Sequence, residues 1–281
     1  MDEPVEPASV LRFEPGQQPR YEPHQLLPEA PLTIRLPPHP DIALMRTPGS
    51  DRELVVGFLL TEGFIRTLAD IATLEVCEDA ADRIGVTLLN REKGDTIPHR
   101  VPLFPAGMLV ASSCGLCGRE RIDALLSDIP PLEDHTRFPV GILFDAPGRM
   151  REAQALFKRT GASHAAALFD TAGNLLVVRE DIGRHNALDK AIGHAVLTRR
   201  SLADCGAMLS GRASFEMVAK AARAGLPLVA AVSAPSALAV EAAEHWNVTL
   251  CGFCRGADVT CYAHAERLTQ AGQDRRDEPG G

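Results

Sequence analysis

The sequence predicts an α/β protein of two domains, an N-terminal α+β domain over residues 32–139 and a C-terminal layered α/β domain over residues 140–270. The chain has 281 residues, a length that often corresponds to about two domains. From about residue 140, apolar strands alternate with helical segments of 11 to 13 residues, which is typical of a layered sheet with parallel neighbours. The first half of the chain lacks this regular alternation.

Both ends of the chain are predicted to lie outside these domains. Ten of the 21 prolines fall within the first 40 residues, among charged and polar positions. Proline lacks a backbone donor and favours extended backbone, so we expect residues 1–31 to form a flexible, extended leader. Residues 271–281 follow the last predicted strand and are expected to form a flexible tail.

The N-terminal domain is predicted to begin with a strand and a capped helix. The run PLTIRL (31–36) predicts the strand, and a turn at Pro48 and Gly49 follows it. Ser50 and Glu53 have the spacing of a capping box at the start of a helix that ends near residue 64. The buried stripe of this helix is expected to contain Leu54, Val55, Phe58 and Leu59. Two neighbouring strands are predicted over residues 73–79 and 83–89.

Two cysteines follow these strands in the segment ASSCGLCGRER (111–121). Cys114 and Cys117 are three residues apart and are flanked by glycine. Apolar residues recur at helical spacing after them, at Ile122, Leu125, Leu126 and Ile129. The pair is therefore expected in a loop just before a helix. Such a pair can be half of a zinc site, a redox dithiol or the seat of a reactive thiolate.

The C-terminal domain is predicted as a succession of strands and helices. It begins with a helix over 150–161 and two strands, 165–170 and 175–180, joined by the turn TAGN. The other helices are predicted over 186–198, 214–225 and 236–247, and the other strands over 205–210, 227–233, 248–253 and 259–264.

Composition and charge exclude several classes of function. The net charge is −8, whereas nonspecific nucleic-acid binders are usually basic, so we expect no appreciable affinity for DNA or RNA. The N-terminus has no basic start or apolar core typical of a signal peptide, and the most apolar stretch, 226–240, is too short to span a bilayer. We therefore expect a cytoplasmic protein without membrane contact. Its seven cysteines are expected to be reduced, so a cysteine pair indicates metal binding or chemistry rather than a disulfide.

Small residues and arginines occur at the ends of several predicted strands. In an open α/β sheet, ligands bind beyond the carboxyl ends of the strands. The junctions are residues 179–186, 209–214, 232–237 and 252–258, and they contain Arg184, His185, Ser210, Gly211, Arg212 and Arg255. Free helix N–H groups beside guanidinium groups bind phosphate, so convergence of these junctions would form an anion-binding crevice. Taken singly, each junction is better explained by ordinary helix capping. Neither a GxGxxG nor a GxxxxGK[ST] motif is present.

Other polar and sulfur-containing residues carry weaker signals. His185, Asp189 and Lys190 could form a polar cluster at the crevice, although a surface hydrogen bond is the simpler explanation. Cys251 and Cys254 could complete a zinc site with the first pair, but they are 134 residues away and lie in an apolar strand. Inert positions are expected for the remaining cysteines, Cys77, Cys205 and Cys261. The His264-Ala265-Glu266 match to zinc deaminases lacks a following cysteine pair, and no metal site is predicted.

The first cysteine pair is best explained as a reactive thiol. A thiolate is the nucleophilic form of cysteine, and its pKa falls ahead of a helix N-terminus and beside cations such as Arg119 and Arg121. Gly115 and Gly118 leave the sulfur atoms without neighbouring side chains that would shield them. A thioredoxin-like site would follow the first strand of a βαβ unit, and this loop has no such setting.

Seven segments resemble the FdhD family, the sulfurtransferases that act as accessory proteins for formate dehydrogenase. In order from residue 45 to 256 they are MRTPGSDRELVVGFLLTEG, SSCGLCGRE, TGASHAAAL, REDIGRHNALDKAIG, LSGRASFEMVAKA, SAPSALAVEAA and TLCGFCRG. One departure is TGASHAAAL, where the family more often has a second glycine after TG.

The resemblance implies a function that the residues alone do not give. Sulfur would come from a cysteine desulfurase as a persulfide on Cys114, with Cys117 as its partner. It would pass to the molybdenum or tungsten bis-guanine-dinucleotide pterin cofactor before insertion into the catalytic subunit of formate dehydrogenase. The segment Phe253, Cys254, Arg255, Gly256, Ala257 and Asp258 would bind that cofactor, for which GDP is a mimic. A homodimer and a three-layer C-terminal domain similar to cytidine deaminase, without its zinc, are also implied.

A binding module remains the alternative. In that hypothesis the cysteines hold a structural metal, and the protein chaperones a cofactor without sulfur chemistry. The metal content of the purified protein distinguishes the two hypotheses.

Overall fold

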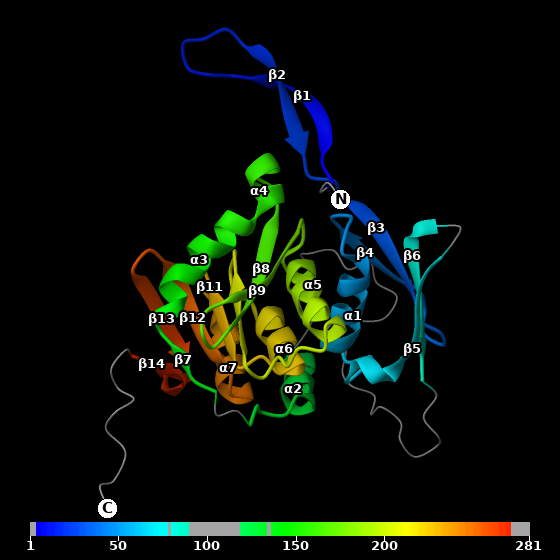
Figure 1. Cartoon of the computed structure of the whole chain (residues 1–281), viewed down its shortest axis with the longest axis vertical. Helices are drawn as coiled ribbons and strands as arrows, with labels where there is room; N and C mark the ends of the chain where they lie inside the picture. Colours follow the sequence, from blue (N-terminus) through cyan, green and yellow to red (C-terminus); the bar gives the residue numbers. More distant parts are fainter. Residues whose placement is uncertain (1–3, 78–79, 90–118, 134–135, 271–281) are drawn as a thin grey trace, which may run out of the picture.

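The computed structural model describes residues 4–77, 80–89, 119–133 and 136–270 (Figure 1). The largest sheet has six strands in the order β13-β12-β11-β10-β8-β9. Its strands are β8 (His164–Asp170), β9 (Leu175–Asp181), β10 (Cys205–Leu209), β11 (Leu228–Ala231), β12 (Thr249–Arg255) and β13 (Asp258–Ala263). Beside it, β7 (Phe138–Pro139) pairs with β14 (Leu268–Thr269), which follows the short 3-10 helix η2 (Ala265–Arg267).

This sheet is mixed, and the prediction of parallel neighbours holds only for its centre. β10, β11 and β12 run parallel, as predicted. β8 is antiparallel to both β9 and β10, and β13 is antiparallel to β12. Short turns cause the difference, because a strand that follows its neighbour through a tight turn must reverse direction, whereas β10 to β12 are joined by helices.

Helices cover both faces of the sheet, which confirms the predicted three layers. One face carries α3 (Ile142–Ala153), and the other carries α5 (Arg184–Leu197), α6 (Phe215–Ala224) and α7 (Ala237–Trp246) (Figure 1). Successive residues of β8 alternate between the faces: Ala167 and Phe169 pack in the core with α3, while Ala166 and Leu168 pack in the core with α5.

A second sheet and one helix form the N-terminal part. The sheet has the order β4-β3-β6-β5, with β3 (Ala30–Arg35), β4 (Ile42–Arg46), β5 (Ile71–Cys77) and β6 (Ala80–Leu88). Helix α1 (Asp51–Thr61) lies between this sheet and α5, and the 3-10 helix η1 (Leu68–Asp70) precedes β5. The predicted stripe Leu54, Val55, Phe58 and Leu59 is buried. One apolar core joins these side chains to α5, α6 and the larger sheet.

The helix after the cysteine pair is present as α2 (Arg119–Asp128). It packs with the C-terminal helices: Asp128 accepts a hydrogen bond from Arg223 at 2.6 Å, and Trp246 and Leu132 are joined by a backbone hydrogen bond of 3.0 Å. Residues 119–133 therefore contact the domain that was predicted to begin only at residue 140. The boundary near residue 139 stays a prediction.

The proline-rich leader forms a regular β-hairpin, a structure that the sequence did not indicate, and its flexibility stays a prediction. β1 (Glu6–Arg12) and β2 (Arg20–Leu26) pair in antiparallel register and project from the body (Figure 1). A two-stranded ribbon tolerates proline because each strand has an outer edge where no backbone donor is required. Across the ribbon, Arg12 donates to Glu22 at 2.9 Å.

The single helix predicted over residues 150–161 is instead divided between two helices. α3 ends at Ala153, and a separate helix α4 (Ala155–Thr160) begins after Gln154, whose φ and ψ of −78° and 84° are not helical. The carboxylate of Glu180 accepts the backbone N–H groups of Leu156 and Phe157, both at 2.8 Å. A buried carboxylate therefore starts α4 afresh, which helical periodicity could not indicate.

Helices α1 and α5 touch through their backbones at two glycines. A Cβ atom added to Gly57 would lie 1.8 Å from the carbonyl oxygen of Asp189, and one added to Gly193 would lie 1.9 Å from that of Glu53. Both distances are far below van der Waals contact. Only glycine permits this crossing, which joins the N-terminal sheet to the C-terminal one.

Buried charges lie beside the crossing. Lys220 of α6 donates to Asp189 at 2.8 Å, to Glu62 at 3.0 Å and to Thr61 at 2.9 Å, and its side chain is 1% exposed. Burial raises the pKa of Asp189 to about 6. A single ammonium group thus balances two carboxylates from two different helical segments, which fixes α1, α5 and α6 relative to one another.

Gly57→Ala and Gly193→Ala are each expected to destabilise the protein by about 3 kcal/mol or more, because a methyl group would push two backbones apart. Gly148→Ala in α3 is the matched control, since an added Cβ there meets open space and alanine favours a helix. Thermal unfolding of the three variants measures the difference. A melting temperature of either crossing variant equal to that of Gly148→Ala would contradict the packing described.

Lys220→Met is expected to cost about 3–5 kcal/mol near neutral pH, because Asp189 and Glu62 lose their counter-charge. Protonation of a carboxylate relieves this loss. A folded-state pKa above the unfolded value means that stability is retained at low pH and lost as the pH rises, so the variant should be weakened more at about pH 8 than at about pH 5.5. Denaturant unfolding at both pH values tests this, with the exposed Lys158→Met as control. Equal losses at the two pH values would argue against a raised pKa of Asp189.

Candidate functional site

The structure confirms that the four predicted junctions lie at the same edge of the six-stranded sheet. They are residues 179–186, 209–214, 232–237 and 252–258. β10, β11 and β12 are parallel, and β9 shares their direction because β8 runs opposite to both β9 and β10. The first three junctions lead into α5, α6 and α7. The fourth is the turn of a hairpin between β12 and β13, in agreement with the strands predicted over residues 248–253 and 259–264.

Two arginines and a histidine come together at this edge. His164 is the first residue of β8. A Cβ atom added to Gly211 would lie 3.5 Å from Nδ1 of the His164 ring, so the ring is next to this glycine. Burial, followed by the positive charges of Arg184 and Arg212, lowers the pKa of His164. Arg184 is partly buried and Arg212 is exposed. The junctions after β9 and β10, the two strands that flank β8 in the sheet, therefore carry two arginines whose charges act on the imidazole of His164.

His185 lies deeper than His164. It is 9% exposed, and burial together with the charges of Lys220 and Arg184 lowers its pKa to about 3. The ring is therefore neutral at physiological pH. His185 can contribute a hydrogen bond to a ligand at this edge but no charge.

Backbone contacts fix the loops after β10 and β11. Ser233 donates its N–H to the carbonyl of Gly211 at 3.4 Å, and Ser236 donates to Ala213 at 3.0 Å. The hydroxyl of Ser210 accepts the N–H of Ala165 at 2.8 Å. That acceptor role still leaves the hydroxyl hydrogen of Ser210 available to a ligand.

The two serines that start α6 and α7 differ in their contacts. Ser236 caps α7 by accepting the N–H of Ala239 at 3.2 Å. Ser214 occupies the equivalent position in α6, but its hydroxyl makes no capping bond. Its Oγ is buried, and no described residue makes a hydrogen bond with it. A buried hydroxyl of this kind beside Gly211 and Arg212 is a polar group that a ligand can satisfy.

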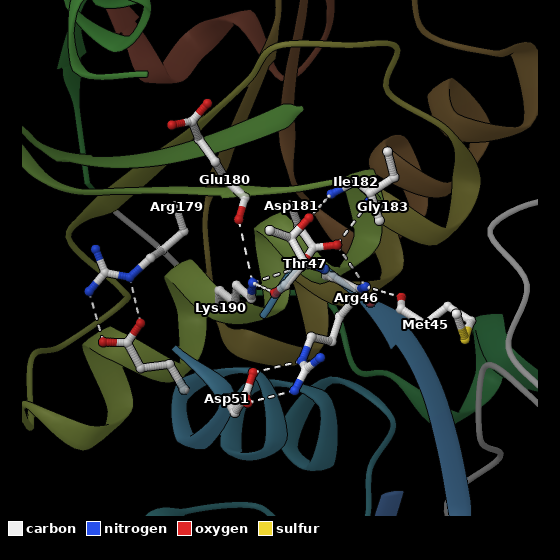
Figure 2. A network of polar contacts seen from close by, with 12 residues as sticks. Met45, Arg46, Thr47, Asp51, Arg179, Glu180, Asp181, Ile182, Gly183 and Lys190 are labelled. Atoms are coloured by element: carbon white, nitrogen blue, oxygen red, sulfur yellow. Dashed lines mark hydrogen bonds and ion pairs between the residues drawn. The ribbon is translucent and has the colours of Figure 1, made fainter. Parts of the chain in front are cut away.

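A buried carboxylate positions the start of α5 (Figure 2). Asp181 forms an ion pair with Lys190 at 2.7 Å and accepts the N–H groups of Gly183 at 2.9 Å and Thr47 at 3.1 Å. Lys190 also donates to the carbonyl of Thr47 at 2.8 Å. The loop after β4 therefore holds the turn that presents Arg184.

These contacts correct the prediction of a polar cluster in which His185, Asp189 and Lys190 face the crevice or make a surface hydrogen bond. Asp189 is 1% exposed and pairs with Lys220, while Lys190 is 2% exposed and pairs with Asp181. Successive residues on a helix point in different directions, so the two charges reach different partners. Of the three, only His185 has electrostatic contact with His164 and Arg184.

The segment from Phe253 to Asp258 forms the tip of the β12–β13 hairpin. Arg255 pairs with Asp258 across the turn, and Gly256 has a positive φ of 61°. The guanidinium of Arg255 lies 5.4 Å from the centre of the Phe253 ring, and both Arg255 and Ala257 are exposed. The side chain of Cys254 is buried among apolar residues, so any contact of this residue with a ligand would use its backbone.

The described cysteines differ in the direction in which their surroundings shift the thiol pKa. Burial raises the pKa of Cys205 and of Cys254 to about 11 in each case. Cys251 faces Cys261 on the neighbouring strand, and a hydrogen bond from Cys251 lowers the pKa of Cys261 to about 7. The expectation that Cys261 is inert stays a prediction, and its position opposite Cys251 is a feature that it did not include. A cross-strand partner cannot be recognised from spacing along the chain.

Cys114 and Cys117 lie outside the described residues. Helix α2 begins at Arg119, so the predicted order of cysteine pair and helix is confirmed. His164 is the site residue that the sequence analysis assigned no role. It precedes a strand rather than following one, and its place at this edge depends on the reversed direction of β8.

Among the described residues, no group of three or more His, Cys, Asp or Glu side chains is arranged to hold a metal ion. The described helices include none that is both long and apolar enough to cross a membrane.

Comparison with known proteins identifies related chains. The model of the FdhD/NarQ family matches residues 27–269. A protein from Streptomyces coelicolor named sulfur carrier protein FdhD is 40% identical, over 94% of this chain and 95% of its own. One of the same name from Sulfurisphaera tokodaii is 42% identical, over 80% of this chain and 83% of its own.

A solved structure shares the fold. It is the crystal structure of a protein described as a formate dehydrogenase accessory protein from Desulfotalea psychrophila, with a TM-score of 0.73 and 23% identity, over 94% of this chain and 99% of that one. The extent of the family match and the identity of the relatives together establish that this chain belongs to the FdhD/NarQ family.

Proposed function

We propose that the protein is a sulfur carrier that takes persulfide sulfur from a cysteine desulfurase onto Cys114 and passes it to a guanine-dinucleotide pterin cofactor. Relatives at 40% and 42% identity bear the name sulfur carrier protein FdhD. The observation that carries the proposal is the position of the cysteine pair directly before α2, which begins at Arg119. The N-terminus of a helix stabilises a thiolate, and a thiolate is the form that sulfur transfer requires.

The first step is a thiol–persulfide exchange. The Cys114 thiolate attacks the outer sulfur of the donor persulfide, the donor S–S bond breaks, and the donor leaves as a thiolate. Cys114 then holds the sulfur as a persulfide. Attack by Cys117 on the inner sulfur of that persulfide would form a Cys114–Cys117 disulfide and release the outer sulfur as sulfide, a two-electron reduction balanced by oxidation of the two cysteines.

At this sheet edge the protein would bind the phosphate-bearing part of the cofactor, which is the substrate of this carrier. Arg184 and Arg212 supply charge-assisted hydrogen bonds, and Ser214 has a buried hydroxyl that no described residue satisfies. Phe253 and Arg255 at the β12–β13 hairpin offer an aromatic ring and a further guanidinium. The cofactor carries molybdenum or tungsten and receives the sulfur before it enters the catalytic subunit of formate dehydrogenase.

The same proposal includes several properties of the whole protein. The C-terminal domain is related in fold to cytidine deaminase but uses no zinc, and the protein acts as a homodimer in the cytoplasm. These statements rest on the family resemblance, and the three-layer arrangement of α3, the sheet and α5 to α7 is compatible with the first. A stoichiometric zinc in the purified protein would instead support the metal-stabilised chaperone.

Cys114→Ala is expected to abolish sulfur loading and the maturation of formate dehydrogenase while leaving the melting temperature unchanged. Cys117→Ala should load sulfur but turn over slowly or not at all. Cys205→Ala is the matched control, because its thiol is buried and its pKa is raised to about 11. Incubation with a desulfurase and labelled cysteine, followed by mass spectrometry, measures the loading. Label retained on Cys114→Ala would overturn the assignment. A large drop in the melting temperature of either variant would indicate that the cysteine pair has a structural role.

GDP is expected to bind to the wild-type chain, and Arg212→Ala should weaken that binding by at least about tenfold, since a charge-assisted hydrogen bond contributes about 1.5–3 kcal/mol. Arg200→Ala is the control, because Arg200 is exposed in the loop before β10, at the opposite edge of the sheet. Calorimetric titration gives the affinities. Equal affinities of wild type and Arg212→Ala would remove Arg212 from the site, and absence of GDP binding would exclude the crevice.

A further inference from the structure

His164 is a histidine at a charged edge that no described residue holds by a hydrogen bond. Its ring is partly exposed and lies next to Gly211 in the turn after β10, where an added Cβ atom would be 3.5 Å from Nδ1 of the ring. The charged or titratable groups that face it are Arg184 and His185 at the start of α5, Asp181 at the end of β9, and Arg212 before α6.

The balance of charge around this ring is positive. Asp181 is the single carboxylate among the described groups that act on it, and that carboxylate is already paired with Lys190 at 2.7 Å. Arg184 and Arg212 remain as cations beside the ring. Without a ligand, an added proton on His164 would place a third positive charge near these two, which disfavours the protonated imidazole.

We propose that His164 takes up a proton when a diphosphate binds between Arg184 and Arg212, so that the ligand is bound together with that proton. This inference rests on the proposed binding of a guanine dinucleotide and assigns a role to a residue outside the sites given above. The bound diphosphate carries two or more negative charges, which reverse the sign of the field at the ring. The imidazolium then donates a hydrogen bond to a phosphate oxygen.

His185 is less suited to this role. It is 9% exposed, whereas the ring of His164 is partly exposed, and the cations that act on it are Lys220 and Arg184. A proton there would be buried as well as repelled. In this proposal His185 remains neutral, and His164 is the histidine that gains a proton when the ligand binds.

The direction of the pH dependence follows from linkage. Burial and the two arginines lower the pKa of His164 in the free protein, and the diphosphate raises it in the complex. Between these two pKa values the complex holds one proton more than the free protein. Affinity therefore falls as the pH rises, by at most about tenfold per pH unit for one proton. Below the lower pKa value this dependence disappears.

Calorimetric titration of the full chain with GDP and with inorganic pyrophosphate tests the proposal. Titrations in two buffers of different ionisation enthalpy, repeated between about pH 5 and pH 8, give the number of protons taken up. Wild type should take up as much as one proton per ligand. His164→Gln should lose that uptake and keep only the pH dependence of the phosphate itself, which titrates near pH ~6. Guanosine, which has no phosphate, should cause no uptake.

Two further variants identify the histidine. His24→Gln, an exposed position on the β1–β2 hairpin, should behave as wild type. Uptake that survives in His164→Gln but is lost in His185→Gln would overturn the proposal in favour of the buried ring. Histidine-ring NMR of the wild type, with and without pyrophosphate, decides the question even if His164→Gln does not fold: one ring should become protonated, and no change in any ring would overturn the proposal.

The outcomes separate this inference from the proposed function. Binding of GDP without proton uptake, or with uptake that His164→Gln retains, overturns the role of His164 and leaves the cofactor assignment standing. If neither GDP nor pyrophosphate binds, both the role of His164 and the cofactor assignment fall.

Discussion

The backbone contact between α1 and α5 determines how the two halves of the molecule fit together. Gly57 and Gly193 bring the helices so close that no Cβ atom fits at either position. Lys220 then joins both helical segments to α6 through Asp189 and Glu62. The N-terminal sheet is thus held against the C-terminal sheet by close packing and by buried charge at the same place.

Helix α5 transmits this constraint to the sheet edge. One end of the helix contains Gly193, and the other begins with Arg184 and His185. Asp181 holds that end by an ion pair with Lys190 and by a hydrogen bond from the backbone of Thr47, which belongs to the N-terminal part. A site built on such a rigid helix start keeps its donors in position before a ligand arrives, which lowers the cost of binding.

Sequence reasoning predicted the parts of the fold that depend on local periodicity. The apolar runs of β10 to β12 and the stripes of α1 and α2 follow directly from residue spacing. The β1–β2 ribbon and the break before α4 were missed because they depend on an outer edge that tolerates proline and on a distant carboxylate, Glu180. Arg184 and Arg212 could be selected because they follow strands. His164 could not, because its position depends on the direction of β8.

The buried thiols of the larger sheet have a consequence for the retention of cargo. A thiol accepts sulfur from a persulfide only as a thiolate, and a pKa of about 11 leaves about one thiol in ten thousand in that form at neutral pH. Cys205 and Cys254 therefore compete poorly for a sulfur atom loaded elsewhere on the chain. In the proposed function, the low reactivity of Cys205 and Cys254 would limit the loss of sulfur to these two buried thiols between its loading and its delivery.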